Sequence, residues 1–253
     1  MDYSIAIYII FGILPSLIWL FYYLRQDLHP EPRKKIIQIF FWGVLSTVPV
    51  FFVQMGLQYL LSKIGLNSAA YNFIYWFLII ALSEEFFIYL VIKFKVIDSP
   101  DLDEPLDVML YMVISALGFA ALENVLYLFS PIGNSTFVQL IDRTLIISFI
   151  RFIGATFLHT LSSAVIGYSL AISFYETKKR YLIVFLGVTA ATLLHGLYDF
   201  SIMTLDGYAK IAIPIIIILT LALLVFSGFK KLKKMKSVCL ALPDLAKRDK
   251  IIK

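Results

Sequence analysis

Several hallmarks of soluble enzymes are missing from this sequence. It contains a single cysteine, Cys239, which excludes an internal disulfide and places the only thiol in a basic tail, away from the apolar part of the chain. It has neither the His-Glu-x-x-His segment of the common zinc proteases nor a Gly-x-Ser-x-Gly turn to support a serine nucleophile. Residues 1–3 lack the basic start of a cleaved signal peptide, so the first apolar run is predicted to be a retained helix.

Charge is scarce as well, whereas hydrophobic residues are abundant. Only 15% of the 253 residues are charged, 60% are hydrophobic, and the mean hydropathy is +0.88. A soluble domain averages about 45–50% apolar residues, so an all-α, polytopic helical bundle in the cell membrane is predicted. The net charge of +5 does not indicate a nucleic-acid partner, because the basic residues lie in loops and in the tail.

Seven apolar runs are long enough to cross a bilayer, which requires about 20 residues per helix. In chain order they are residues 5–24, 36–61, 71–92, 106–129, 144–175, 181–203 and 211–229. The fifth run is unusually long, which is compatible with a tilted helix or with an interfacial turn near Arg143. We therefore expect a transmembrane domain at residues 1–229 and a basic cytoplasmic tail at residues 230–253.

Basic residues alternate between the loops that join these runs. The first, third and fifth loops and the tail each carry at least two lysines or arginines near the membrane, whereas the intervening loops carry one each, namely Lys63, Arg143 and Lys210. By the positive-inside rule, the N-terminus is predicted to lie outside and the C-terminus in the cytoplasm.

Two adjacent carboxylates, Glu84 and Glu85, lie inside the third apolar run. A charged side chain near the bilayer centre costs about 2.5–3.5 kcal/mol on insertion scales, and neighbouring carboxylates also repel each other. Partners that offset this cost are therefore expected on other helices. The candidates that the apolar runs carry are Glu123, Asn124, Arg151, His159, His195 and Asp199.

These acids and imidazoles are predicted to meet in one layer of the membrane. When successive helices alternate in direction and rise 1.5 Å per residue, the third to sixth helices deliver them to within roughly 10 Å of a common depth. Intramembrane ionisable groups normally face a bundle interior or a wet cavity. Close packing of the fourth, fifth and sixth helices is expected from their glycines, which are Gly118, Gly154, Gly167 and Gly196.

Local spacing suggests different roles for neighbouring residues. Glu84 and Glu85 point about 100° apart on a helix, so one can face a cavity while the other binds a neighbouring helix. His195 and Asp199 are four residues apart and share a helix face, where the carboxylate can fix the tautomer of the imidazole.

A structural role is the alternative for each of these residues. Taken singly, Glu123 or His159 can serve as an interhelical hydrogen bond, which is worth about 0.6 kcal/mol on average. Arg151 is expected to be a counter-ion or to snorkel toward the outer face. Asn124 is either an interhelical contact or an oxyanion donor.

Carboxylates and imidazoles in a partly dry site are suited to activating water. A glutamate can accept the proton of the water, while a histidine or an asparagine polarises the carbonyl and stabilises the oxyanion. Glu84, Glu123, His159 and His195 are also candidate ligands for a divalent metal such as zinc. The residues alone leave open whether the site uses a metal or no cofactor.

The order of these motifs resembles the PrsW family of intramembrane proteases, which is distantly similar to the CAAX prenyl endopeptidases. The resemblance rests on Glu84-Glu85, on residues 119–124 (Phe-Ala-Ala-Leu-Glu-Asn), on His159 with Gly167 eight residues later, and on His195-x-x-x-Asp199. Asp27 followed by Pro30-Glu31-Pro32 is similar to the family's segment after the first helix. The resemblance covers about residues 20 to 205. One position departs from the pattern, because Ile88 stands where the family usually has a lysine.

The resemblance implies an intramembrane endopeptidase that cuts a membrane-anchored protein, such as an anti-sigma factor or a similar regulator. Its residue roles would make Glu84 the general base with Glu85 in support, Glu123 and His159 part of the water- or metal-binding centre, and His195, aided by Asp199, the oxyanion stabiliser. The partners would be the protein substrate and the lipid bilayer. Two alternatives remain from the residues alone: a proton-coupled transporter or channel, since acid and histidine chains also relay protons, and a catalytically inactive scaffold.

Overall fold

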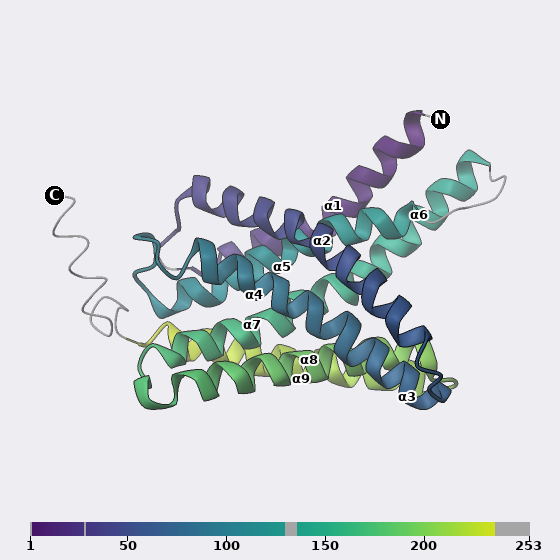
Figure 1. The fold of residues 1–253 in the computed structure, drawn as a ribbon. Coiled ribbons are helices and arrows are strands. Elements are labelled where there is room, and N and C mark those ends of the chain that lie inside the picture. The colour runs from purple at the N-terminus through teal and green to yellow at the C-terminus, as the bar shows by residue number, and fades with distance from the viewer. Residues whose placement is uncertain (1, 28, 130–135, 236–253) are drawn as a thin grey trace.

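The computed structural model describes residues 2–27, 29–129 and 136–235, and within these ranges the chain is helical, without strands (Figure 1). The helices are α1 (Asp2–Leu24), α2 (Arg33–Ser62), α3 (Ser68–Phe73), the π-helix η1 (Ile74–Ala81), α4 (Leu82–Lys95), α5 (Pro105–Leu128), α6 (Phe137–Ile153), α7 (Ala155–Ser173), the 3₁₀ turn η2 (Thr177–Lys179), α8 (Arg180–Thr204) and α9 (Ala209–Leu232). Six helical spans among the described residues are long and apolar enough to cross a membrane. The polytopic helical bundle is confirmed.

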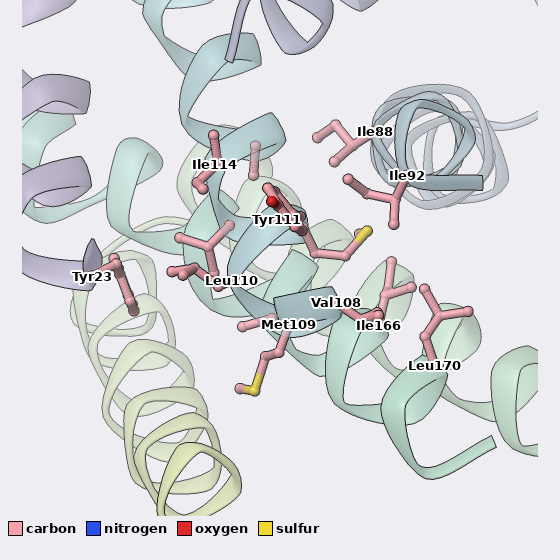
Figure 2. Packing of buried hydrophobic residues seen from close by; sticks show 14 of the residues in the cluster. Tyr23, Ile88, Ile92, Val108, Met109, Leu110, Tyr111, Ile114, Ile166 and Leu170 are labelled. Atoms are coloured by element: carbon pink, nitrogen blue, oxygen red, sulfur yellow. The ribbon is translucent and has the colours of Figure 1, made fainter. Parts of the chain in front are cut away.

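Helix α5 forms the centre of the bundle. Nearly all of its residues are buried, and it packs against α7, α2 and α1. Figure 2 shows its side chains, among them Tyr111 and Ile114, meeting Tyr23 of α1 and Ile88 of α4. A helix that is apolar on every face is stable only when other helices surround it or when it faces lipid, and α5 is the surrounded case.

Two glycines allow α2 and α5 to cross with their backbones in contact. A Cβ on Gly43 would lie 2.1 Å from the carbonyl oxygen of Ser115, and a Cβ on Gly118 would lie 2.0 Å from that of Phe40. The expectation that Gly118 packs against the later helices is therefore wrong, since its partner is α2. Gly167 does join α7 closely to α5, where its Cβ would lie 2.7 Å from the Cα of Met109.

The third predicted span is one uninterrupted run of helix made of α3, η1 and α4. Its π-helical part ends three residues before Glu84. A π-segment widens the helix and shifts the direction of the side chains that follow, and such segments often occur at functional sites. The orientation of Glu84 and Glu85 therefore depends on an irregularity that a regular 3.6-residue repeat does not predict.

The fifth predicted span is not a single tilted helix but two helices, α6 and α7, separated at Gly154. The hydroxyl of Tyr198 lies 2.5 Å from where a Cβ of Gly154 would be, so this position has no room for a side chain. Trp19 on α1 donates a hydrogen bond of 2.9 Å from Nε1 to the carbonyl oxygen of Phe152 in the last turn of α6. An apolar run without proline gives no sign of such a break, beside which side chains from α1 and α8 lie.

The basic loops lie at one end of the bundle, on the left in Figure 1. Lys35 Nζ donates to the carbonyl oxygen of Lys95 at 2.9 Å, and Lys233 Nζ donates to Gln26 Oε1 at 3.4 Å. This arrangement agrees with the alternation of basic loops, while the side of the membrane on which they lie stays a prediction. Helix α9 continues to Leu232, three residues beyond the predicted span, and Cys239 lies outside the described residues.

The Pro-Glu-Pro segment fastens the α1–α2 connection to α5. Asp27 accepts hydrogen bonds from the backbone N–H groups of His29 at 3.0 Å and Glu31 at 3.2 Å, which closes a tight turn. The buried carboxylate of Glu31 accepts a hydrogen bond of 2.5 Å from the hydroxyl of Tyr111. The motif thus has a structural role in this chain, far from the intramembrane acids.

Glu31 is expected to make thermal stability depend on pH. Burial raises the pKa of Glu31 from 4.5 to about 7, although the hydrogen bond from Tyr111 acts in the opposite direction. A carboxyl group with a raised pKa in the folded state stabilises the fold fully below pH 4.5, and this contribution is lost as the pH rises through about 7. The Tm of purified protein in detergent should therefore fall between pH 5 and pH 8 more steeply for the wild type than for Glu31→Gln. Equal slopes would contradict the prediction, and Glu176→Gln, at an exposed position between α7 and α8, is the matched control.

Candidate active site

Four elements bring the intramembrane acids and histidines together around one cavity. Glu84 comes from the first turn of α4, Glu123 from α5, His159 from α7, and His195 and Asp199 from α8. All five line a cavity of about 580 Å³. The structure therefore assembles the predicted layer, and it does so with side chains that are up to 115 residues apart in the chain, from Glu84 to Asp199.

Glu84 is the member of the acidic pair that faces the cavity. Its Oε1 accepts a hydrogen bond of 2.9 Å from Gln54 Nε2 on α2. Its Oε2 lies 3.6 Å from His195 Nε2 and 4.0 Å from His159 Nε2. The side chain is only 7% exposed, so it meets the cavity and is otherwise enclosed by protein.

Glu85 points into the protein instead. It is fully buried and accepts hydrogen bonds from Ser162 Oγ and, at 2.8 Å, from Ser163 Oγ, both on α7. Its Oε1 also lies 2.8 Å from His195 Nδ1. The divergence of the two carboxylates follows from their position on consecutive residues of a helix, as the sequence predicts.

The carboxylate that orients His195 is Glu85 rather than Asp199. Glu85 pairs with Nδ1 at 2.8 Å, whereas Asp199 lies 3.4 Å from Nε2, the nitrogen that also faces Glu84. A partner on Nδ1 fixes the ring orientation and leaves Nε2 directed at the cavity. The spacing of four residues correctly places Asp199 on the same face of α8 as His195, whereas the partner of Nδ1 comes from α4.

Arg151 is a buried counter-ion, with an exposed fraction of 9%. Its Nη2 donates to Glu123 Oε2 at 2.5 Å, and the same oxygen lies 3.0 Å from His159 Nε2. Its guanidinium carbon lies 3.9 Å from the centre of the Tyr127 ring. Of the two roles expected for Arg151, the counter-ion is the one observed.

Asn124 joins helices and does not reach the cavity. Its Nδ2 donates to Thr156 Oγ1 at 2.9 Å, and its Oδ1 accepts from Arg151 Nε at 2.5 Å. Among the described residues, neither Asn124 nor Glu85 lines the cavity. Asn124 therefore acts on the centre through Arg151 and Glu123.

The remaining wall of the cavity is mostly apolar and aromatic. Side chains from α2, η1, α5, α6, α7 and α8 contribute, and they include Phe51, Tyr75, Trp76, Phe119, Tyr127, Ile147, Ile150 and Ile202. A polar centre within an apolar wall suits a ligand whose chain is apolar and whose reacting group is polar.

Comparison with known proteins agrees with this geometry. The model of the PrsW family intramembrane metalloprotease matches residues 31–227. The chain belongs to the PrsW family. It is therefore an intramembrane protease and a multi-pass protein of the cell membrane.

Several relatives cover most of the chain. Protease PrsW of Geobacillus kaustophilus is 30% identical over 200 residues, which is 78% of this chain and 80% of the relative. Protease PrsW of Oceanobacillus iheyensis is 30% identical over 208 residues, covering 82% and 88%. Protease PrsW of Bacillus subtilis is 29% identical over 229 residues, covering 90% and 94%. No solved structure matches.

The description of the PrsW family as metalloproteases calls for a test of whether the residues fit a metal. One donor atom from each of Glu84, His159 and His195 lies within 4.8 Å of the others. Two imidazoles and one carboxylate are a known ligand set of catalytic zinc, where bonds of about 2.0–2.1 Å in tetrahedral geometry separate the donors by roughly 3.4 Å. The observed 3.6 and 4.0 Å are close to that spacing, so these three residues fit a divalent ion. Glu123, the fourth predicted ligand, lies outside this group and is paired with Arg151.

The PrsW position that usually carries lysine is part of the apolar core here. Ile88 is fully buried and lies beside Ile92 in the cluster shown in Figure 2. Glu84 and Glu85 interact with polar side chains of α2, α7 and α8. These interactions stabilise the two carboxylates without a basic residue at position 88.

Sequence reasoning overlooked the residues that hold the acids in place. Gln54, Ser162, Ser163 and Thr156 all donate or accept hydrogen bonds within the centre. Serine and threonine are common in membrane helices, so they carry little signal. The amide of Gln54, within the apolar run at residues 36–61, was the stronger sign of a residue that contacts the acids.

Proposed function

We propose that this chain hydrolyses a peptide bond of a membrane-anchored regulatory protein of the anti-sigma-factor kind, using water activated by Glu84, His159 and His195. The observation that supports it is the meeting of Glu84 Oε2 with both Nε2 atoms inside a cavity with apolar walls. An apolar membrane-spanning segment fits such walls, and its scissile amide can then reach the polar centre.

The residues divide the work of hydrolysis between them. Glu84 Oε2 accepts a proton from the attacking water, which His159 helps to orient, and returns it to the amide nitrogen as the C–N bond breaks. His195 Nε2, when protonated, donates to the oxyanion that develops on the substrate carbonyl. Glu85 keeps His195 in position through Nδ1, and Asp199 lies near Nε2 as a further proton acceptor.

In a metal-assisted form of the reaction, Glu84, His159 and His195 would instead hold a divalent ion such as zinc through these same atoms. A bound ion of this kind supplies Lewis acidity, which polarises a carbonyl oxygen and makes water a better nucleophile at neutral pH. Without an ion, Glu123, which is paired with Arg151, contacts His159 at this same Nε2, so a bound ion would take the place of that contact.

A cleavage assay on purified protein in lipid vesicles tests the proposal. The substrate is a single-span membrane protein with a label on each side of its apolar segment, and the assay is run with and without chelator alongside metal analysis. We expect wild-type protein to release a labelled fragment and His195→Ala to release at least 100-fold less, since oxyanion donors contribute about 10²–10³ in kcat. Cleavage lost with chelator and restored with zinc supports the metal-assisted form. Equal rates in wild type and His195→Ala would contradict the proposal.

A further inference from the structure

Gln54 reaches the hydrolytic centre from α2, a helix that supplies none of the predicted catalytic residues. Its Nε2 donates to Glu84 Oε1 at 2.9 Å and lies 3.2 Å from Ser83 Oγ. It also lines the cavity, one turn away from Val50. Among the described residues, it is the side chain that donates a hydrogen bond to Glu84.

The orientation of the Gln54 amide follows from its partners. The hydroxyl of Ser83 has its proton directed at backbone carbonyls, those of Ile79 at 2.6 Å and Ile80 at 3.0 Å, so Ser83 Oγ is free to accept. Glu84 Oε1 is an acceptor as well. Both neighbours therefore require the NH₂ end of Gln54, which carries two donors.

This contact determines which oxygen of Glu84 faces the histidines. The last torsion of a glutamate side chain is broad and roughly two-fold, so a free carboxylate samples many orientations. With Oε1 held by Gln54, Oε2 is directed at His195 Nε2 and His159 Nε2, at 3.6 and 4.0 Å. Loss of the donor would leave the carboxylate in place but free to rotate.

We propose that Gln54 is a positioning residue of the centre, which fixes the carboxylate of Glu84 so that one oxygen faces both imidazoles. The inference rests on the proposed function, because it assigns Gln54 a role in the same hydrolytic centre. It holds whether Glu84 receives a proton or binds an ion, since both require the same orientation. Residues that orient metal ligands through hydrogen bonds typically contribute 10- to 100-fold to activity or metal affinity.

The test compares Gln54→Met with wild type in the vesicle cleavage assay. Methionine has a similar volume but no donor, so the packing of α2 is kept while the hydrogen bond is lost. We expect kcat to fall 10- to 100-fold, KM to change less than about twofold, and the Tm to stay within about 2 °C. Gln58→Met, at an exposed position one turn along α2, is the matched control and should behave as wild type.

A second measurement keeps this inference separate from the proposed function. Zinc affinity, measured by competition with a chromophoric chelator, is expected to be 10- to 100-fold weaker in Gln54→Met than in wild type. If wild type shows no cleavage, the proposed function fails, while the zinc affinities still decide the role of Gln54. Unchanged kcat together with unchanged zinc affinity would overturn the inference. A loss confined to KM would also overturn it, because Gln54 would then be a substrate contact.

Discussion

Replacement of Glu84 by glutamine is expected to abolish cleavage. Glutamine has nearly the same size but cannot accept a proton, so the attacking water loses its base. General-base catalysis contributes about 10² to 10⁴ in rate. We expect kcat to fall by at least a factor in this range, because Glu84 also faces both imidazoles. The measurement is release of the labelled fragment in single-turnover conditions, with enzyme in excess over substrate.

The fold should survive this change. Removing a charge from a buried site lowers the cost of desolvation, so the Tm of Glu84→Gln should equal or exceed that of the wild type. Asp206→Asn, at an exposed position between α8 and α9, is the matched control. It tests whether loss of a carboxylate outside the site also changes cleavage or the Tm. Wild-type cleavage in Glu84→Gln would remove Glu84 from the mechanism.

Replacement of Gly118 by valine is expected to have the largest effect on stability. A Cβ at this position would lie 2.0 Å from the carbonyl oxygen of Phe40 and 3.0 Å from the backbone nitrogen of Val44. A backbone cannot yield as a side-chain tip can, so α2 and α5 would have to move apart along their crossing. Overpacking typically costs about 1–3 kcal/mol, and at the upper end this lowers the Tm by about 6–12 °C for a chain of this size.

The crossing also supports the active site, because α2 carries Gln54. Gly118→Val should therefore lower both the Tm and the cleavage rate. The control is Gly56→Val on α2, where a Cβ would meet no atom within 4 Å. If both variants melted at the wild-type temperature, the close contact of α2 with α5 would be contradicted.

The transmembrane helices could be predicted because a bilayer imposes a simple length requirement. Each of the seven apolar runs contains an observed helix or helices, and the ends of six runs agree within a few residues. The exception is the fifth run, in which hydropathy continues across Gly154 while the helix does not. Hydropathy indicates whether lipid or water surrounds a segment. It carries no information about the break at Gly154, where Trp19 and Tyr198 are neighbouring side chains.

The meeting of five ionisable side chains at one depth could also be predicted from the sequence, whereas Glu85 and Asn124, which were predicted with them, do not line the cavity. Ionisable side chains are costly in lipid, so their presence in apolar runs marks them, and helix rise places them at one depth. Glu84, Glu123, His159, His195 and Asp199 do line one cavity. The same reasoning could not rank their contacts, because depth along a helix is one coordinate and leaves the rotation about the axis open.

The sequence by itself thus determined a helical membrane protein with a layer of acids and histidines, since both properties depend on local composition and on the rise of a helix. Only the tertiary structure decided which atoms meet. It assigned His195 Nδ1 to Glu85 instead of Asp199, paired Glu123 with Arg151, and brought Gln54 from α2 to Glu84. Those pairings depend on helix crossings, on the π-segment before Glu84 and on the break at Gly154, which are properties of several helices packed together.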